Sequence, residues 1–195
     1  AQESCQIDSQ IDQLQEMTGK PATKTIHHLV MMSPDEFRPK YINHAGFRVL
    51  QLTTPSPEFN WFMYQIIGPD YRWGGRNDWS KENWTAFVSK PSLETWLAYQ
   101  DGNPVGYYEM ELMKDRTIKI HCVGLIKKYI GLGLGAHLLS HCVDRGWQHN
   151  PTKITLNTCS HDHPRALPNY LKRGFRLEHN SIEPENSTWE SKIFK

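Results

Sequence analysis

The chain has 195 residues, and its 22 lysines and arginines nearly balance 21 aspartates and glutamates, which gives a net charge of +1. This length predicts one domain with a sizeable core, and the charge balance argues against a nucleic-acid-binding or membrane-surface protein. No apolar run is long enough to span a bilayer and no secretory signal is visible, so we expect a cytoplasmic protein. Four scattered cysteines without paired spacing are typical of reduced thiols.

The first part of the chain predicts an arm and then the start of a domain. Residues 1–24 are polar with one short apolar stripe, which indicates a packing arm or, alternatively, a dimer arm; both a monomer and a homodimer stay open. We expect one domain over residues 25–180 and a C-terminal extension over 181–195. Strands are predicted at 27–32 and 47–53, with a turn at 33–36 after the first. Helices are predicted at 57–68 and 79–89, and Ser80 is the predicted N-cap of the second helix.

The second part alternates strands and helices. Strands at 95–100 and 105–113 form a predicted hairpin that turns at 101–103, and residues 117–126 form a nearly apolar strand. A glycine loop then opens a helix that ends near residue 149, followed by a strand at 153–159, a helix at 164–173 and a strand at 175–178. Gly174 is predicted to cap the last helix and Pro168 to kink it.

The glycine loop is the most informative segment. Gly131, Gly133 and Gly135 let the backbone approach a ligand closely, and the following helix offers unpaired N–H groups that bind phosphate. A P-loop is excluded because Ala136, and not lysine, follows Gly135. A dinucleotide fingerprint is excluded because its glycine spacing differs and the next strand ends in Cys159 without an acid. A kinase loop would lie between two strands.

Two motifs together resemble those of the GNAT superfamily of N-acetyltransferases. The stretch Ile130-Gly131-Leu132-Gly133-Leu134-Gly135 is similar to the family's cofactor motif, Gln/Arg-x-x-Gly-x-Gly/Ala, at the start of a helix. The second motif runs from His163 through Tyr170 to Gly174-Phe175. Ile130 replaces the usual Gln or Arg, and His163 replaces the common Asn. The resemblance covers residues 95–178 and implies an α/β (α+β) fold with a mixed, mostly antiparallel sheet flanked by helices on both faces.

The resemblance implies that acetyl-CoA is the donor and that a small-molecule amine attacks it directly in a ternary complex. Tyr170 stands at the family's general-acid position, where it would protonate the CoA thiolate. Lys127 or Lys128 would assist the backbone amides at the pyrophosphate. The implied cofactor-binding residues are Val123, Gly124, Leu125, Ile126, Ile130, Gly131, Leu132, Gly133, Leu134, Gly135, Ala136, His163 and Tyr170.

The general base is less clearly marked. Glu109 shares a strand face with Glu111 and Tyr107 and is the first choice, because one of these carboxylates would face the cleft. His121 is the alternative, since its unperturbed pKa near 6.5 suits a base. Cys122 is read as a core thiol and not as a covalent acetyl carrier.

The acceptor pocket is predicted in the aromatic, glycine-rich loop that holds Tyr71, Trp73, Arg76 and Trp79. No metal is expected, because the run His161-Asp162-His163 has no further ligand at a suitable spacing. Asp162 or His163 is instead predicted to be the N-cap of the following helix. Two other functions stay open: an acyl-CoA-binding or sensing module with little catalysis, and a protein or peptide N-acetyltransferase.

Overall fold

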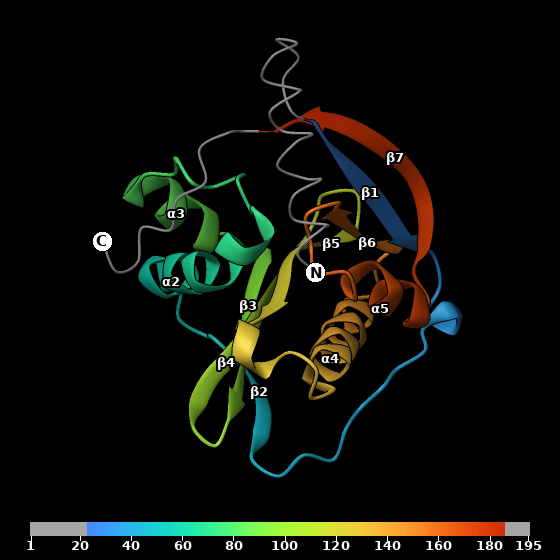
Figure 1. Cartoon of the computed structure of the whole chain (residues 1–195), viewed down its shortest axis with the longest axis horizontal. Helices are drawn as coiled ribbons and strands as arrows, with labels where there is room; N and C mark the ends of the chain where they lie inside the picture. Colours follow the sequence, from blue (N-terminus) through green and yellow to red (C-terminus); the bar gives the residue numbers. More distant parts are fainter. Residues whose placement is uncertain (1–22, 186–195) are drawn as a thin grey trace, which may run out of the picture.

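The computed structural model describes residues 23–185 (Figure 1). The predicted N-terminal arm, up to residue 22, and residues 186–195 of the predicted extension lie outside this range. No helix within residues 23–185 is long and apolar enough to cross a membrane.

A seven-stranded sheet forms the centre of the fold, in the order β2-β3-β4-β5-β6-β1-β7. Only β5 and β6 pair in parallel, and the other neighbours are antiparallel. The predicted mixed, mostly antiparallel sheet is therefore confirmed. The strands are β1 (Thr23–Met31), β2 (Phe47–Gln51), β3 (Leu93–Gln100), β4 (Asn103–Leu112), β5 (Thr117–Leu125), β6 (Lys153–Cys159) and β7 (Arg176–Pro184).

Helices cover both faces of this sheet, as predicted (Figure 1). α2 (Pro57–Ile67) and α3 (Lys81–Val88) bury one cluster, which includes Tyr64, Trp84 and Tyr107. α4 (Leu134–Gln148) and α5 (Ala166–Lys172) bury the larger cluster on the other face. Three short 3-10 helices, η1 (Pro34–Glu36), η2 (Gly68–Tyr71) and η3 (Lys127–Tyr129), join these elements.

Local signals placed most of these boundaries. Ser80 and Asn83 form a reciprocal capping box at the start of α3, because each side chain accepts a hydrogen bond from the other's backbone N–H. The hairpin between β3 and β4 turns at Asp101 (φ 50°) and Gly102 (φ 80°), which is the left-handed geometry that a two-residue hairpin requires. Gly174 has φ 104° directly after α5, as its predicted capping role requires.

Three sequence-based predictions were wrong around α5 and β7. α5 begins at Ala166 after Arg165 as N-cap, so Asp162 and His163 do not cap it. Pro168 then lies in the first turn, where its missing N–H removes no helical hydrogen bond, and the kink is unnecessary. The last strand runs from residue 176 to 184, well beyond the predicted 175–178, because β1 pairs with it along its length.

The chain crosses the molecule between β1 and β2. β1 lies between β6 and β7, whereas β2 forms the opposite edge of the sheet. Residues 37–46, here called the strap, make this crossing over α4 (Figure 1). The strap is fixed to the helix because the Lys40 N–H donates to Ser140 Oγ (2.8 Å) and the Ile42 N–H donates to His137 Nδ1 (3.3 Å).

Candidate active site

A cleft opens where β5 and β6 part. Their parallel pairing extends only from Thr117 and Lys153 to Ile120 and Leu156. Beyond it β5 stays paired to β4 as far as Leu125, and β6 stays paired to β1. The separated strand ends line a cleft of about 940 Å³, which collects most of the predicted site residues. These are Tyr71, Trp73, Arg76, Trp79, His121, Val123, Gly124, Leu125, Ile130, Gly131, Gly133, Gly135, Ala136, His163 and Tyr170.

The glycine loop forms one end of the cleft. Gly131 (φ 94°) and Gly133 (φ 83°) have left-handed backbones, and Gly133 is the N-cap of α4 without a side-chain capping bond. The first backbone N–H groups of α4 are therefore free to donate hydrogen bonds to a ligand. This arrangement fits the diphosphate of CoA. Of the predicted cofactor residues, Leu132 is 54% exposed, Leu134 is fully buried in the core, and neither they nor Ile126 line the cleft.

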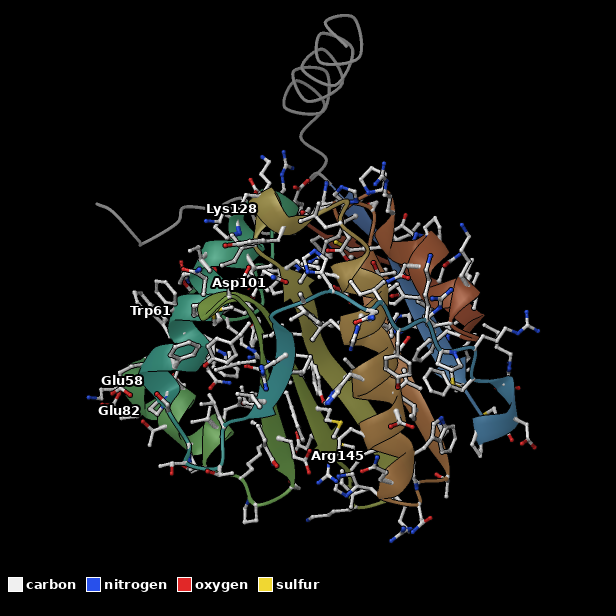
Figure 2. The ribbon with its side chains drawn as sticks, turned by 90° about the horizontal axis from the view of Figure 1, so that it is seen from below. Glu58, Trp61, Glu82, Asp101, Lys128 and Arg145 are labelled. Atoms are coloured by element: carbon white, nitrogen blue, oxygen red, sulfur yellow. The ribbon has the colours of Figure 1, made fainter. Side chains whose placement is uncertain are left out.

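The cations near the loop differ from those predicted. Lys127 forms an exposed ion pair with Asp70 (Nζ–Oδ1 3.3 Å), and Lys128 lies over the Tyr129 ring. Figure 2 shows Lys128 at the glycine-loop end of the molecule and Arg145 toward the other end of α4. Neither lysine lines the cleft, whereas Arg165 does, with its Nη1 beside Gly131. Arg165 could not be predicted from the sequence, because a lone arginine before a helix carries no signal.

Tyr170 of α5 is another residue of the cleft. Its side chain is buried but lines the cleft, and its hydroxyl has no hydrogen-bond partner within residues 23–185. Burial raises the pKa of this hydroxyl above its ordinary value of 10.0, so the group stays protonated at neutral pH. A protonated hydroxyl without a partner is available to donate a proton.

His121 lines the same cleft, and Glu111 forms a hydrogen bond with its imidazole. Its Nε2 lies 2.9 Å from Glu111 Oε2, and Lys90 Nζ donates to Glu111 Oε1 at 3.1 Å. Burial lowers the pKa of His121 from 6.5 and outweighs the opposite effect of Glu111. The imidazole is therefore neutral at neutral pH, as a general base must be.

Glu109, the first-choice base, is fully buried and does not line the cleft. Arg76 Nη1 donates to its Oε2 at 2.7 Å, and Asn60 Nδ2 donates to its Oε1 at 2.7 Å. The carboxylate is thus engaged on both oxygens beneath the cleft floor. This arrangement suits a group that fixes Arg76 in place.

Arg76 is surrounded by aromatic rings. Its Cζ lies 4.2 Å from the Phe87 ring centroid and 4.9 Å from that of Trp79, with Tyr64 and Trp84 also within 5.5 Å. Such cation–π contacts and the Glu109 ion pair stabilise a guanidinium that is 9% exposed. Arg76 of the predicted acceptor loop is therefore packed against aromatic side chains and also lines the cleft.

Trp73 connects the two sides of the cleft. A Cβ added to Gly124 on β5 would lie 3.1 Å from Trp73 Cη2, so the glycine allows the indole to pack on the strand. Trp73 Nε1 donates to Asp162 Oδ1 (3.1 Å), and Asp162 Oδ2 accepts from the Cys159 N–H (2.9 Å). Asp162 therefore orders the loop after β6, a role that the sequence did not reveal.

Tyr71, His163 and Cys122 are the remaining candidates. Tyr71 and His163 meet edge to face across the cleft, with centroids 6.2 Å apart. Burial raises the pKa of the Cys122 thiol to about 12, which leaves it protonated and a poor nucleophile. Within residues 23–185, no three His, Cys, Asp or Glu side chains gather as a metal site requires.

Solved structures share this fold at low sequence identity. GCN5-related N-acetyltransferases from Sphaerobacter thermophilus (TM-score 0.65, 15% identity) and Kribbella flavida (TM-score 0.60, 16% identity) match 89% and 84% of this chain. The chain spans only 55% and 59% of those proteins. A fungal GCN5-related glucosamine N-acetyltransferase region matches 90% of this chain at 13% identity (TM-score 0.61), over 22% of its own chain. No protein of curated function matches the sequence.

The sequence itself matches a family model. The model of the acetyltransferase (GNAT) family aligns with residues 60–175. This range contains the acceptor loop, the separated strands, the glycine loop and Tyr170, and it covers more than half of the chain. The chain therefore belongs to the acetyltransferase (GNAT) family.

Proposed function

We propose that the protein transfers an acetyl group from acetyl-CoA to the amine of a small molecule. The observation that carries this proposal is the unpartnered, protonated Tyr170 hydroxyl in the cleft that also holds the neutral His121 and the glycine loop. Acetyl-CoA, when bound, supplies an acetyl thioester that an amine can attack. Residues 131–136 would hold its diphosphate through backbone N–H groups.

We assign the general base to His121. An acceptor amine must lose a proton, because ordinary amines are protonated near neutral pH. The neutral His121 faces the cleft and is oriented by Glu111, whereas both oxygens of Glu109 already accept hydrogen bonds from Arg76 and Asn60. His121 would accept the amine proton, and Glu111 would stabilise the imidazolium that results.

Tyr170 would complete the proton transfers. Its hydroxyl would donate a proton to the sulfur as the carbon–sulfur bond breaks, and the tyrosinate would be reprotonated from solvent. The free edge of β5 beyond Ile120 would offer backbone N–H groups to the thioester oxygen. Each of these groups belongs to a rigid strand or helix, which favours their precise positioning.

A small acceptor is favoured over a protein or peptide. The Trp73–Asp162 hydrogen bond joins the acceptor loop to the loop after β6, so this part of the cleft is bridged. An extended peptide needs an open groove, which such a bridge obstructs. An aromatic floor around Arg76 suits a compact molecule.

The test is release of the CoA thiol with a panel of small amines, amino acids and amino sugars. We expect acceptor-dependent release with at least one member, and Tyr170→Phe to lower kcat by about 100-fold, as is typical for loss of a general acid. Tyr129→Phe, outside the cleft, is the matched control. Acetyl-CoA binding without release for any acceptor would favour a sensing module, and an unimpaired Tyr170→Phe would remove Tyr170 from the mechanism.

A further inference from the structure

Arg173 is a buried cation without an acidic partner. Its residue is only 9% exposed, and its Nε and Nη1 atoms have no hydrogen-bond partner within residues 23–185. Burial lowers the pKa of Arg173 below its ordinary value, and no neighbouring carboxylate opposes this effect. Arg76, also 9% exposed in the same cleft, differs because Glu109 neutralises it.

The cleft that Arg173 lines is rich in cations. Lys40, Arg165 and Lys172 line the cleft with Arg173, and none of the four takes part in an ion pair within the described residues. Among the described acidic residues, only Asp162 lines the cleft, and it is already engaged by Trp73 and the Cys159 N–H. An unneutralised buried charge is costly, so this group favours a bound anion. Guanidinium groups bind phosphate particularly well.

The geometry ties Arg173 to the glycine loop. Asn169 Nδ2 on α5 donates to the Gly135 carbonyl oxygen (3.4 Å), which holds α5 against the start of α4. Arg173 lies one helical turn beyond Asn169 and therefore on the same side of α5. Arg173 is thus about one turn, roughly 5 Å along α5, from the residue that contacts Gly135.

The strap contributes Lys40 to the lining of the cleft. The Lys40 N–H donates to Ser140 Oγ, and Ser140 lies one turn beyond Ala136 on α4, where its hydroxyl donates to the Ala136 carbonyl oxygen (2.8 Å). Arg38 N–H donates to the carbonyl oxygen of Arg173 (3.0 Å), which fixes the strap to α5 as well. Lys40 and Arg173 are therefore held on neighbouring elements by hydrogen bonds of their backbones.

We propose that Arg173 and Lys40 form a phosphate-binding site for the 3′-phosphate of CoA. This assignment rests on the proposed function. The diphosphate and the 3′-phosphate of CoA hang from the same ribose, so a diphosphate at the glycine loop brings the 3′-phosphate to an adjacent position. The strap, which is an N-terminal segment, thereby takes part in choosing CoA over cofactors that lack this phosphate.

The experiment compares CoA with 3′-dephospho-CoA by isothermal titration calorimetry on the full chain. We expect wild type to bind CoA at least tenfold more tightly, which corresponds to about 1.4 kcal/mol. Arg173→Met should bring this ratio close to one without weakening 3′-dephospho-CoA binding, and Lys40→Met should lower the ratio partly. Arg48→Met removes an exposed arginine outside the cleft and should keep the wild-type ratio.

Thermal unfolding without ligand distinguishes binding from a structural role. Because Arg173 has no partner to lose, Arg173→Met should keep or raise the apparent Tm, whereas a structural arginine would lower it. Equal loss of CoA and 3′-dephospho-CoA binding in Arg173→Met, or an unchanged ratio, would overturn the proposal. Inorganic phosphate that stabilises the CoA-saturated wild type would also overturn it, because the site would then serve a separate anion.

Failure of the proposed function gives a different result. Wild type would then bind neither CoA nor 3′-dephospho-CoA, and both proposals would fall. Equal, tight binding of the two by wild type would overturn only the assignment of Arg173 and Lys40.

Discussion

Trp73 donates its indole N–H to Asp162 across the cleft, with Nε1 and Oδ1 3.1 Å apart. The two residues come from different loops and are 89 positions apart in the sequence. One loop shapes the predicted acceptor pocket, and the other leads to Tyr170. This single hydrogen bond therefore joins the loop of the predicted acceptor pocket to the loop that leads to Tyr170.

Removal of that bond should affect the acceptor more than the cofactor. Trp73→Phe keeps an aromatic ring over Gly124 but loses the donor to Asp162. A hydrogen bond to a charged group contributes about 1.5–3 kcal/mol, so the acceptor KM should rise about tenfold or more, with acetyl-CoA affinity unchanged. Steady-state kinetics and calorimetry measure the two effects. Trp61→Phe, on the outer side of α2 in Figure 2, is the control; equal KM values would contradict the coupling.

The pH profile should report His121. In the proposed mechanism the neutral imidazole acts as the base. Burial lowers its pKa below 6.5, so kcat/KM should fall only as the pH drops below about 6.5. His121→Gln should lower kcat/KM by about 100-fold and remove this acidic limb. The profile of His179→Gln, an exposed histidine on β7, should match wild type. An acidic limb that persists in His121→Gln would assign the base to another group.

Glu109 should matter mainly for stability. Glu109→Gln leaves Arg76 buried without a counter-charge, and breaking a buried ion pair costs about 3–5 kcal/mol. Urea unfolding measures this loss. Glu183→Gln, which removes a surface pair with Lys24, should cost less than about 1 kcal/mol. If Glu109→Gln instead unfolds like wild type and loses about 100-fold in kcat, Glu109 is the base after all.

The glycine loop should be more sensitive to added atoms than to lost side chains. A valine at Gly133 would need a left-handed backbone, which costs about 1–2 kcal/mol, and its Cβ would lie 3.3 Å from Ile42 Cγ2. Gly135→Ala is milder for the fold, since its Cβ would meet Leu125 Cδ1 at an ordinary 3.6 Å, yet it adds an atom in the cleft.

Calorimetry with acetyl-CoA checks this expectation. Gly133→Val and Gly135→Ala should weaken binding, whereas Leu132→Ala, which truncates a side chain that is 54% exposed, should leave it within about twofold. Circular dichroism confirms that each variant is folded. If Leu132→Ala lowered the affinity for acetyl-CoA more than Gly135→Ala, binding by backbone amides would be contradicted.

The sequence alone determined the local parts of this protein. The Ser80 capping box, the hairpin at residues 101–102 and the glycine loop each depend on a few neighbouring residues, and their physical signals are readable without a fold. Hydrophobic periodicity and turn signals predicted the order of strands and helices, and the second family motif placed Tyr170 in the helix before Gly174. Predictions were wrong where a helix begins at another residue than expected. Pro168 was predicted to kink its helix, but α5 begins at Ala166 and Pro168 lies in the first turn.

Only the tertiary structure decided which distant residues meet. β1 enters the sheet between β6 and β7, where His28 reaches Ser181 at a sequence separation of 153, and no local pattern specifies that position. Other long-range contacts hold the strap over α4, pair Glu109 with Arg76 and leave Arg173 without a counter-charge. These outcomes depend on burial and on charges brought together by packing, which single-chain periodicity does not encode.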